Sequence, residues 1–148
     1  MSFATIEEII RFAINKEKDA QTFYRSAATL ARYPGIASLF QELAAEEEKH
    51  QKLLEELPDP QTLPESSRTV PDLKISDYLV DLKFHPDMKY QEVMILAMKN
   101  EEKSLKFYQA WEARVEDPAQ KKLFAYLAEQ EAQHKYRLES LYDEKILD

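Results

Sequence analysis

Two short motifs in this sequence place a histidine three residues after a glutamate, inside stretches with a helical apolar pattern. The first motif joins Glu47 to His50, and the second joins Glu131 to His134. At about 100° per residue, positions three apart share one face of a helix, so the carboxylate and the imidazole would project together. Carboxylate oxygen and imidazole nitrogen both bind divalent metal ions, and this spacing therefore predicts metal ligation.

The apolar pattern around the first motif puts its two ligands on the buried face of the helix. Measured around the helix axis from Leu43, Glu47 lies at about 40°, His50 at about −20° and Leu57 at about −40°. Glu48 falls on the far side, where it would face water. The second motif repeats this arrangement, so both pairs are expected in the core.

Two further glutamates stand on the apolar faces of other helical stretches. Glu17 shares a face with Tyr24, and Glu101 shares a face with Tyr108. Buried carboxylates that face one another cost several kcal/mol each when ionised and unpaired, and two divalent cations would neutralise four of them. So much carboxylate oxygen favours iron or manganese over structural zinc, which prefers sulfur and nitrogen. The predicted metal ligands are Glu17, Glu47, His50, Glu101, Glu131 and His134.

An internal repeat explains why these ligands come in matched sets. A shift of 84 residues aligns residues 8–57 with 92–141 without a gap. AINKEKDAQTFY then falls on AMKNEEKSLKFY, and Pro34 falls on Pro118. The chain is therefore predicted to contain one helical hairpin twice.

Capping and breaking residues divide the two copies into four helices. The predicted helices run from the capping box at Thr5 to about Arg32, from the break at 33–35 to about Leu57, from Tyr90 to Val115, and from the Asp117 N-cap to near Tyr142. Residues 75–83 fit an additional short helix.

The proline-rich stretch 58–88 connects the two hairpins. If the second and third helices run parallel, the link must cover the length of a helix, ~30 Å at 1.5 Å per residue. Four helices with one long crossover form the ferritin-like type of bundle. The prediction is an all-α ferritin-like four-helix bundle, a single domain over 1–148 with hairpins 5–57 and 89–142 and a crossover at 58–88.

Composition excludes several other classes of protein. A net charge of −8 argues against nucleic acid or an anionic membrane as partner, and no segment is apolar enough to span a bilayer. The chain has no cysteine, which excludes disulfides, thiolate zinc sites and cysteine-ligated iron–sulfur clusters. The single glycine, Gly35, excludes glycine-rich phosphate loops. The expected location is the cytoplasm.

At these residues the sequence resembles the rubrerythrins and their ferritin-like relatives over essentially the whole chain. The shared motifs are E-x(6)-Y at Glu17–Tyr24, its copy at Glu101–Tyr108, and the two E-x-x-H motifs. The resemblance implies a non-haem centre of two iron ions, with manganese or a mixed pair as alternatives. It also implies an oxidoreductase that reduces hydrogen peroxide, or dioxygen, with electrons from a separate donor protein.

The resemblance further suggests a role for each ligand. Glu47 and Glu131 would bridge the two irons, Glu17 and Glu101 would be terminal ligands, and each iron would carry one histidine. In the family, an additional glutamate follows the third-helix ligand by one turn. Ser104 occupies that position here, which puts the efficiency of peroxide reduction in question.

Several alternatives remain open from the sequence. The protein could instead oxidise and store or hand on iron, as ferritins do, or it could be a metal-free bundle used for interaction. Tyr24 and Tyr108 either hydrogen-bond a ligand carboxylate or are ordinary core tyrosines. Phe23, Phe107 and Trp111 lie off the core stripe, and we expect them to form a homodimer interface or to be covered by the crossover.

Overall fold

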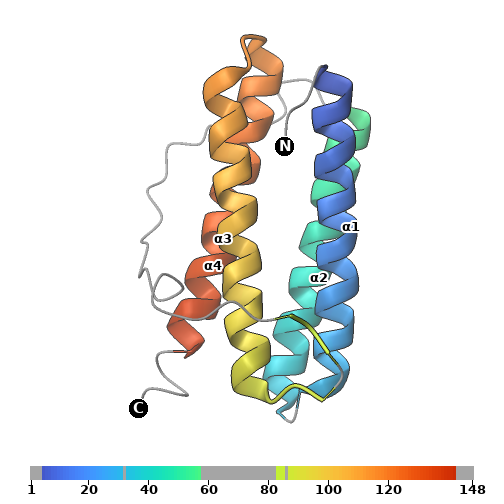
Figure 1. Ribbon diagram of the computed structural model, residues 1–148, viewed down its shortest axis with the longest axis vertical. Helices are drawn as coiled ribbons and strands as arrows, with labels where there is room; N and C mark the ends of the chain where they lie inside the picture. Colours follow the sequence, from blue (N-terminus) through green and yellow to red (C-terminus); the bar gives the residue numbers. More distant parts are fainter. Residues whose placement is uncertain (1–4, 32, 58–82, 86, 143–148) are drawn as a thin grey trace. The chain divides into compact units, whose positions relative to one another are not determined.

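The computed structural model describes residues 5–31, 33–57, 83–85 and 87–142. These residues form four α-helices and no strand (Figure 1). The predicted crossover and the predicted short helix at 75–83 lie largely outside the described residues. The helices are α1 (Ile6–Leu30), α2 (Pro34–Glu56), α3 (Tyr90–Arg114) and α4 (Pro118–Tyr142).

The chain divides into two compact units, Met1–Pro58 and Asp59–Asp148. The first unit contains the hairpin of α1 and α2, and the second contains the hairpin of α3 and α4. Within each hairpin the two helices lie side by side (Figure 1). The predicted all-α chain of two helical hairpins is therefore confirmed.

The helix boundaries follow the sequence repeat. The starts of α1 and α3, at Ile6 and Tyr90, are separated by the same shift of 84 residues that relates the two sequence copies. Pro34 and Pro118, which begin α2 and α4, are separated by the same shift. A proline at the first helical position lacks only an N–H that would have no partner within the helix, so it marks both starts at little cost.

Local capping sets the ends of the first hairpin. The Thr5 hydroxyl accepts a hydrogen bond from the Glu8 backbone N–H at 3.2 Å, as expected for an N-cap. At the other end, Leu57 has a left-handed backbone with φ 46° and donates its N–H to the Leu53 carbonyl at 2.9 Å. The expectation that Leu57 is buried is wrong, because the chain leaves the helix there and exposes 51% of the residue.

One aromatic pair joins the two helices of each hairpin. Tyr24 of α1 stacks on Phe40 of α2 with ring centroids 5.9 Å apart and planes at 26°. Tyr108 of α3 stacks on Phe124 of α4 at 6.1 Å and 27°. All four rings are buried, so each hairpin has its own aromatic anchor at the equivalent place.

The two hairpins differ in how completely their first helix is covered. Residues 93–98 of α3 are all buried, and six consecutive residues cover every side of a helix. In the equivalent stretch of α1, Ile9 and Ala13 are buried but Arg11 is exposed. The first turns of α3 are therefore enclosed, whereas α1 has an apolar face and a solvent face.

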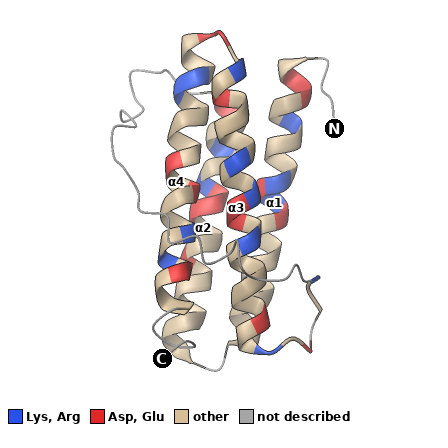
Figure 2. Ribbon diagram, turned by 60° about the vertical axis from the view of Figure 1, so that its left-hand side comes forward, with Lys and Arg blue, Asp and Glu red and all other residues tan. Residues whose placement is uncertain are grey.

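Charged residues of both signs occur along all four helices (Figure 2). Acidic residues occur in the middle of the helices as well as at their ends (Figure 2). Among the described helices, none combines the length and apolar character needed to cross a lipid bilayer.

Candidate metal centre

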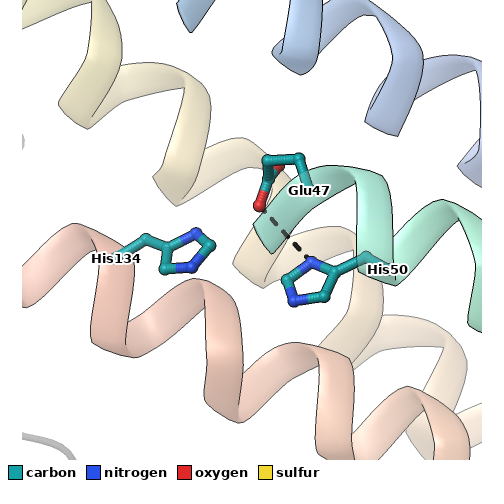
Figure 3. Close-up of side chains that lie close together, drawn as sticks. All are labelled: Glu47, His50 and His134. Atoms are coloured by element: carbon teal, nitrogen blue, oxygen red, sulfur yellow. Dashed lines mark ion pairs between the residues drawn. The ribbon is translucent and has the colours of Figure 1, made fainter. Parts of the chain in front are cut away.

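The first hairpin brings together Glu17 from α1 with Glu47 and His50 from α2, and we call these three residues the first half-site. The Nδ1 atom of His50 lies 3.4 Å from Oε1 of Glu47 and 3.6 Å from Oε2 of Glu17. Figure 3 shows Glu47 and His50 projecting from α2, with this pair marked by a dashed line. All three residues are at most 3% exposed, so one imidazole nitrogen faces two buried carboxylates.

The second hairpin repeats this arrangement with Glu101 from α3 and Glu131 and His134 from α4, which form the second half-site. The Nδ1 atom of His134 lies 3.6 Å from Oε1 of Glu101 and 3.6 Å from Oε1 of Glu131. Figure 3 shows the His134 ring on its helix. These residues are at most 2% exposed. The two half-sites therefore have the same donors, the same facing atom and the same burial.

The distances within each half-site suit a shared metal ion. Two ligand atoms that both lie ~2.1 Å from an ion, at angles between about 90° and 120°, are ~3.0–3.6 Å apart. The four Nδ1–oxygen distances, 3.4–3.6 Å, fall in this range. They exceed the ~2.7–3.2 Å of a good N–H···O hydrogen bond. In each half-site one atom from each of the three ligands lies within 4.8 Å of the others, so the donor set fits a metal ion.

The residue next to the predicted ligand Glu47 confirms the predicted orientation of α2. The Glu48 side chain is 47% exposed and lies 3.6 Å from Arg25 in a surface ion pair. Lys49 is exposed as well, whereas His50 is buried. The acidic run therefore divides as the helical period predicts, with one carboxylate in the core and its neighbour in solvent.

The predicted ligand-orienting tyrosines are core residues of the hairpins. Tyr24 and Tyr108 are each 1% exposed and stack on a phenylalanine, as described above. A hydrogen bond from either hydroxyl to a ligand carboxylate stays a prediction. Ser104, one turn after Glu101 on α3, is half-buried.

A polar layer lies one turn beyond each half-site, and the sequence pattern did not predict it. In the first hairpin, Gln21 of α1 donates a hydrogen bond to Gln51 of α2 at 2.7 Å. In the second hairpin, Lys135 pairs with Glu139 at 3.5 Å, and both side chains are buried. Their positions four and eight residues after the ligand Glu131 were the signal that could have revealed them.

Comparison with known proteins agrees with this description. The sequence model of the rubrerythrin family matches residues 8–142. The chain belongs to the rubrerythrin family. Its structure is also similar to that of a hypothetical protein from Pyrococcus furiosus, with 29% sequence identity, a TM-score of 0.71 and coverage of 95% of this chain and 89% of that chain. The search of curated proteins gave no match.

Membership of the rubrerythrin family confirms the predicted fold class, a ferritin-like helical bundle. It also implies an iron site, and the buried glutamates and histidines provide ligands that suit one. As a rubrerythrin-family protein, the chain is therefore a metal-binding protein by both its sequence and its donor set.

Proposed function

We propose that the two half-sites combine into one dinuclear non-haem iron centre that reduces hydrogen peroxide, or dioxygen. The observation that carries this proposal is the duplicated set of two buried carboxylates and one imidazole. Four carboxylates neutralise two ferrous ions, and each histidine completes the ligands of one ion. A single half-site has two carboxylates for one divalent ion, so equal filling of both keeps the buried charge balanced.

The ligands take the roles that the family resemblance implies. Glu47 and Glu131 would bridge the two ions, and Glu17 and Glu101 would bind one ion each. When bound, the ferrous pair supplies the two electrons that convert peroxide to water. The protein holds the ligands on rigid helices and excludes bulk water from them, since all six side chains are at most 3% exposed. Manganese, or a mixed pair, would use the same ligands.

The proposal includes a separate electron-donor protein in the cytoplasm. The cysteine-free chain has no ligands for an iron–sulfur cluster that could pass electrons to the centre.

We also propose that the protein forms a homodimer, because Phe23, Phe107 and Trp111 remain partly exposed in the single chain. Light scattering at several protein concentrations tests the dimer directly.

The experiment that tests the proposed reaction is anaerobic loading with ferrous iron, followed by rapid mixing with peroxide or with dioxygen. Oxidation by peroxide should be roughly a hundredfold faster, which corresponds to about 2.7 kcal/mol of activation free energy. A similar rate with both oxidants would contradict a peroxidase.

A second candidate function is iron oxidation and storage or transfer. The residue that favours it is Ser104, which replaces the glutamate that follows the third-helix ligand in the peroxide-reducing relatives. Fast oxidation by dioxygen alone, together with a large multi-subunit shell in light scattering, would support this ferritin-like role over the peroxidase.

A further inference from the structure

A row of three buried charged residues runs along α4 from the second half-site. Glu131, Lys135 and Glu139 are four residues apart, so they form one ridge on the helix surface. Their exposed fractions are 0%, 3% and 0%. The Nζ atom of Lys135 lies 3.5 Å from Oε2 of Glu139. Lys135 therefore lies one helical turn after the predicted ligand Glu131, and its buried ammonium group is paired with Glu139.

The equivalent row on α2 consists of Glu47, Gln51 and Glu55, with an amide in the middle instead of an ammonium. Gln51 donates from Nε2 to Oε2 of Glu55 at 3.4 Å and accepts at Oε1 from Gln21 at 2.7 Å. Glu55 is exposed and Gln51 is half-buried. The first half-site is therefore followed by neutral amides.

The stability of a hairpin as such does not explain the difference between the two rows. A buried ion pair has a large desolvation penalty and often stabilises a protein no more than neutral packing does. The first hairpin has the same helices, the same aromatic pair and the same half-site geometry with amides at these positions. The two rows differ in charge, because the second has the ammonium group of Lys135 where the first has the amide of Gln51.

We propose that Lys135 makes the two half-sites unequal, so that the second half-site binds a divalent cation more weakly than the first. This inference rests on the proposed function, because it assumes that both half-sites bind metal. A positive charge repels a nearby cation, and the repulsion is strong where water is excluded. Glu139, whose Oε2 atom lies 3.5 Å from the Lys135 Nζ atom, offsets part of this repulsion, and it follows Glu131 by two helical turns where Lys135 follows it by one.

The consequence is ordered filling. The half-site of Glu17, Glu47 and His50 takes the first ion, and the half-site beside Lys135 takes the second and exchanges it more readily. Lys135 is a positioning residue in this account, because it acts on the ion through its charge and not as a ligand. The expected difference in dissociation constant is about tenfold, equivalent to about 1.4 kcal/mol.

The test measures Co²⁺ binding to each half-site separately, from the absorption bands of the bound ion. The variant His50→Ala leaves the second half-site intact, and His134→Ala leaves the first. We expect Co²⁺ to bind about tenfold more tightly to His134→Ala than to His50→Ala. Equal dissociation constants in the two variants would overturn the inference.

The exchange Lys135→Gln then identifies the cause, since it copies the amide of Gln51 and leaves Glu139 a donor. In the His50→Ala background it should tighten Co²⁺ binding about tenfold. In the His134→Ala background the change should be much smaller. Lys135→Arg, which keeps the charge, should leave the weaker affinity in place. An unchanged affinity after Lys135→Gln, or the same gain from Lys135→Arg, would contradict the role of charge.

The reciprocal variant Gln51→Lys keeps the inference testable if Lys135→Gln does not fold. Gln51 is half-buried and has Glu55 within reach, so the helix accommodates a lysine there. In the His134→Ala background it should weaken Co²⁺ binding several-fold, and no weakening would overturn the inference. If the unmodified protein binds no Co²⁺, the proposed metal centre fails as well. If it binds two ions with equal half-sites, only the inequality fails.

Discussion

The two hairpins are alike at the candidate ligands and differ in what surrounds them. Both have an imidazole Nδ1 atom 3.4–3.6 Å from two buried carboxylates, and both have a stacked tyrosine and phenylalanine. One turn further, the first hairpin has amides and the second has an ion pair. The predicted ligands have the same type and spacing in both hairpins, whereas the neighbouring polar layer is neutral in the first hairpin and charged in the second.

A second contrast lies at the first turns of α1 and α3. Arg11 is exposed on α1, whereas its repeat equivalent on α3, Ile95, is buried. Phe12 and Leu96 differ in the same direction, from half-buried to buried. At these two positions the first turns of α3 are therefore more enclosed than the equivalent turns of α1.

The largest expected effect tests the likeness of the half-sites. Glu47→Ala and Glu131→Ala should each abolish stable binding of the two metal ions, because each removes a bridging ligand of the proposed centre. Glu48→Ala is the matched control, since Glu48 forms only a surface ion pair, worth at most about 1 kcal/mol. Metal content after dialysis measures the outcome. Equal loss in all three variants would mean that α2 does not present Glu47 to the metal.

The aromatic anchors provide the next test of equivalence. Phe40→Ala and Phe124→Ala each remove a fully buried ring from one stacked pair. Such truncations typically cost about 3–5 kcal/mol, and we expect similar losses from the two hairpins. Denaturant unfolding of metal-free protein measures both values. A loss below about 1 kcal/mol in one hairpin alone would show that the repeat is not energetically equivalent.

The contrast between Arg11 and Ile95 predicts that placing each residue type at the other position changes the free energy of unfolding at one of the two positions only. Ile95→Arg places a charge in an enclosed part of α3 and should cost about 2 kcal/mol or more. Arg11→Ile changes an exposed position and should alter the free energy of unfolding by less than about 0.5 kcal/mol. Thermal melting of the two variants compares them, and equal destabilisation would argue against the enclosure of α3.

The smallest expected effect concerns the helix starts, where the hairpins use different caps. Thr5 caps α1 with its own hydroxyl, so Thr5→Ala should cost about 1 kcal/mol. At the start of α3 the carboxylate of Glu92 accepts from the Lys89 backbone N–H at 3.2 Å. Lys89→Ala keeps that bond and should change stability by less than about 0.5 kcal/mol. Unfolding curves that show a larger loss for Lys89→Ala would reverse the assignment of the caps.

The sequence predicts the features of this protein that depend on a single helix or on the repeat. The helical period separates buried Glu47 from Glu48, whose side chain is 47% exposed, and the prolines at 34 and 118 mark the starts of α2 and α4. Each of these features depends on local geometry, so a local pattern contains the information.

The features that the sequence did not predict depend on neighbouring elements. Lys135 and Glu139 lie off the apolar stripe of α4, and their burial depends on what packs around that helix. Leu57 continues the apolar period of α2, but its exposure follows from a left-handed turn that the period does not record. Charged residues at such positions are usually solvated, so the four-residue spacing marks the row on α4 but does not predict that the row is buried.

The most direct test of the central claim is whether two irons bound by this chain are magnetically coupled. The protein is loaded anaerobically with ferrous iron, oxidised, and examined by electron paramagnetic resonance together with iron analysis. If the half-sites form one dinuclear centre, the ferric ions are bridged by carboxylates, their spins couple, and the oxidised protein gives almost no signal from its bound iron. A signal that accounts for all the bound iron as isolated high-spin ferric ions would contradict a dinuclear centre.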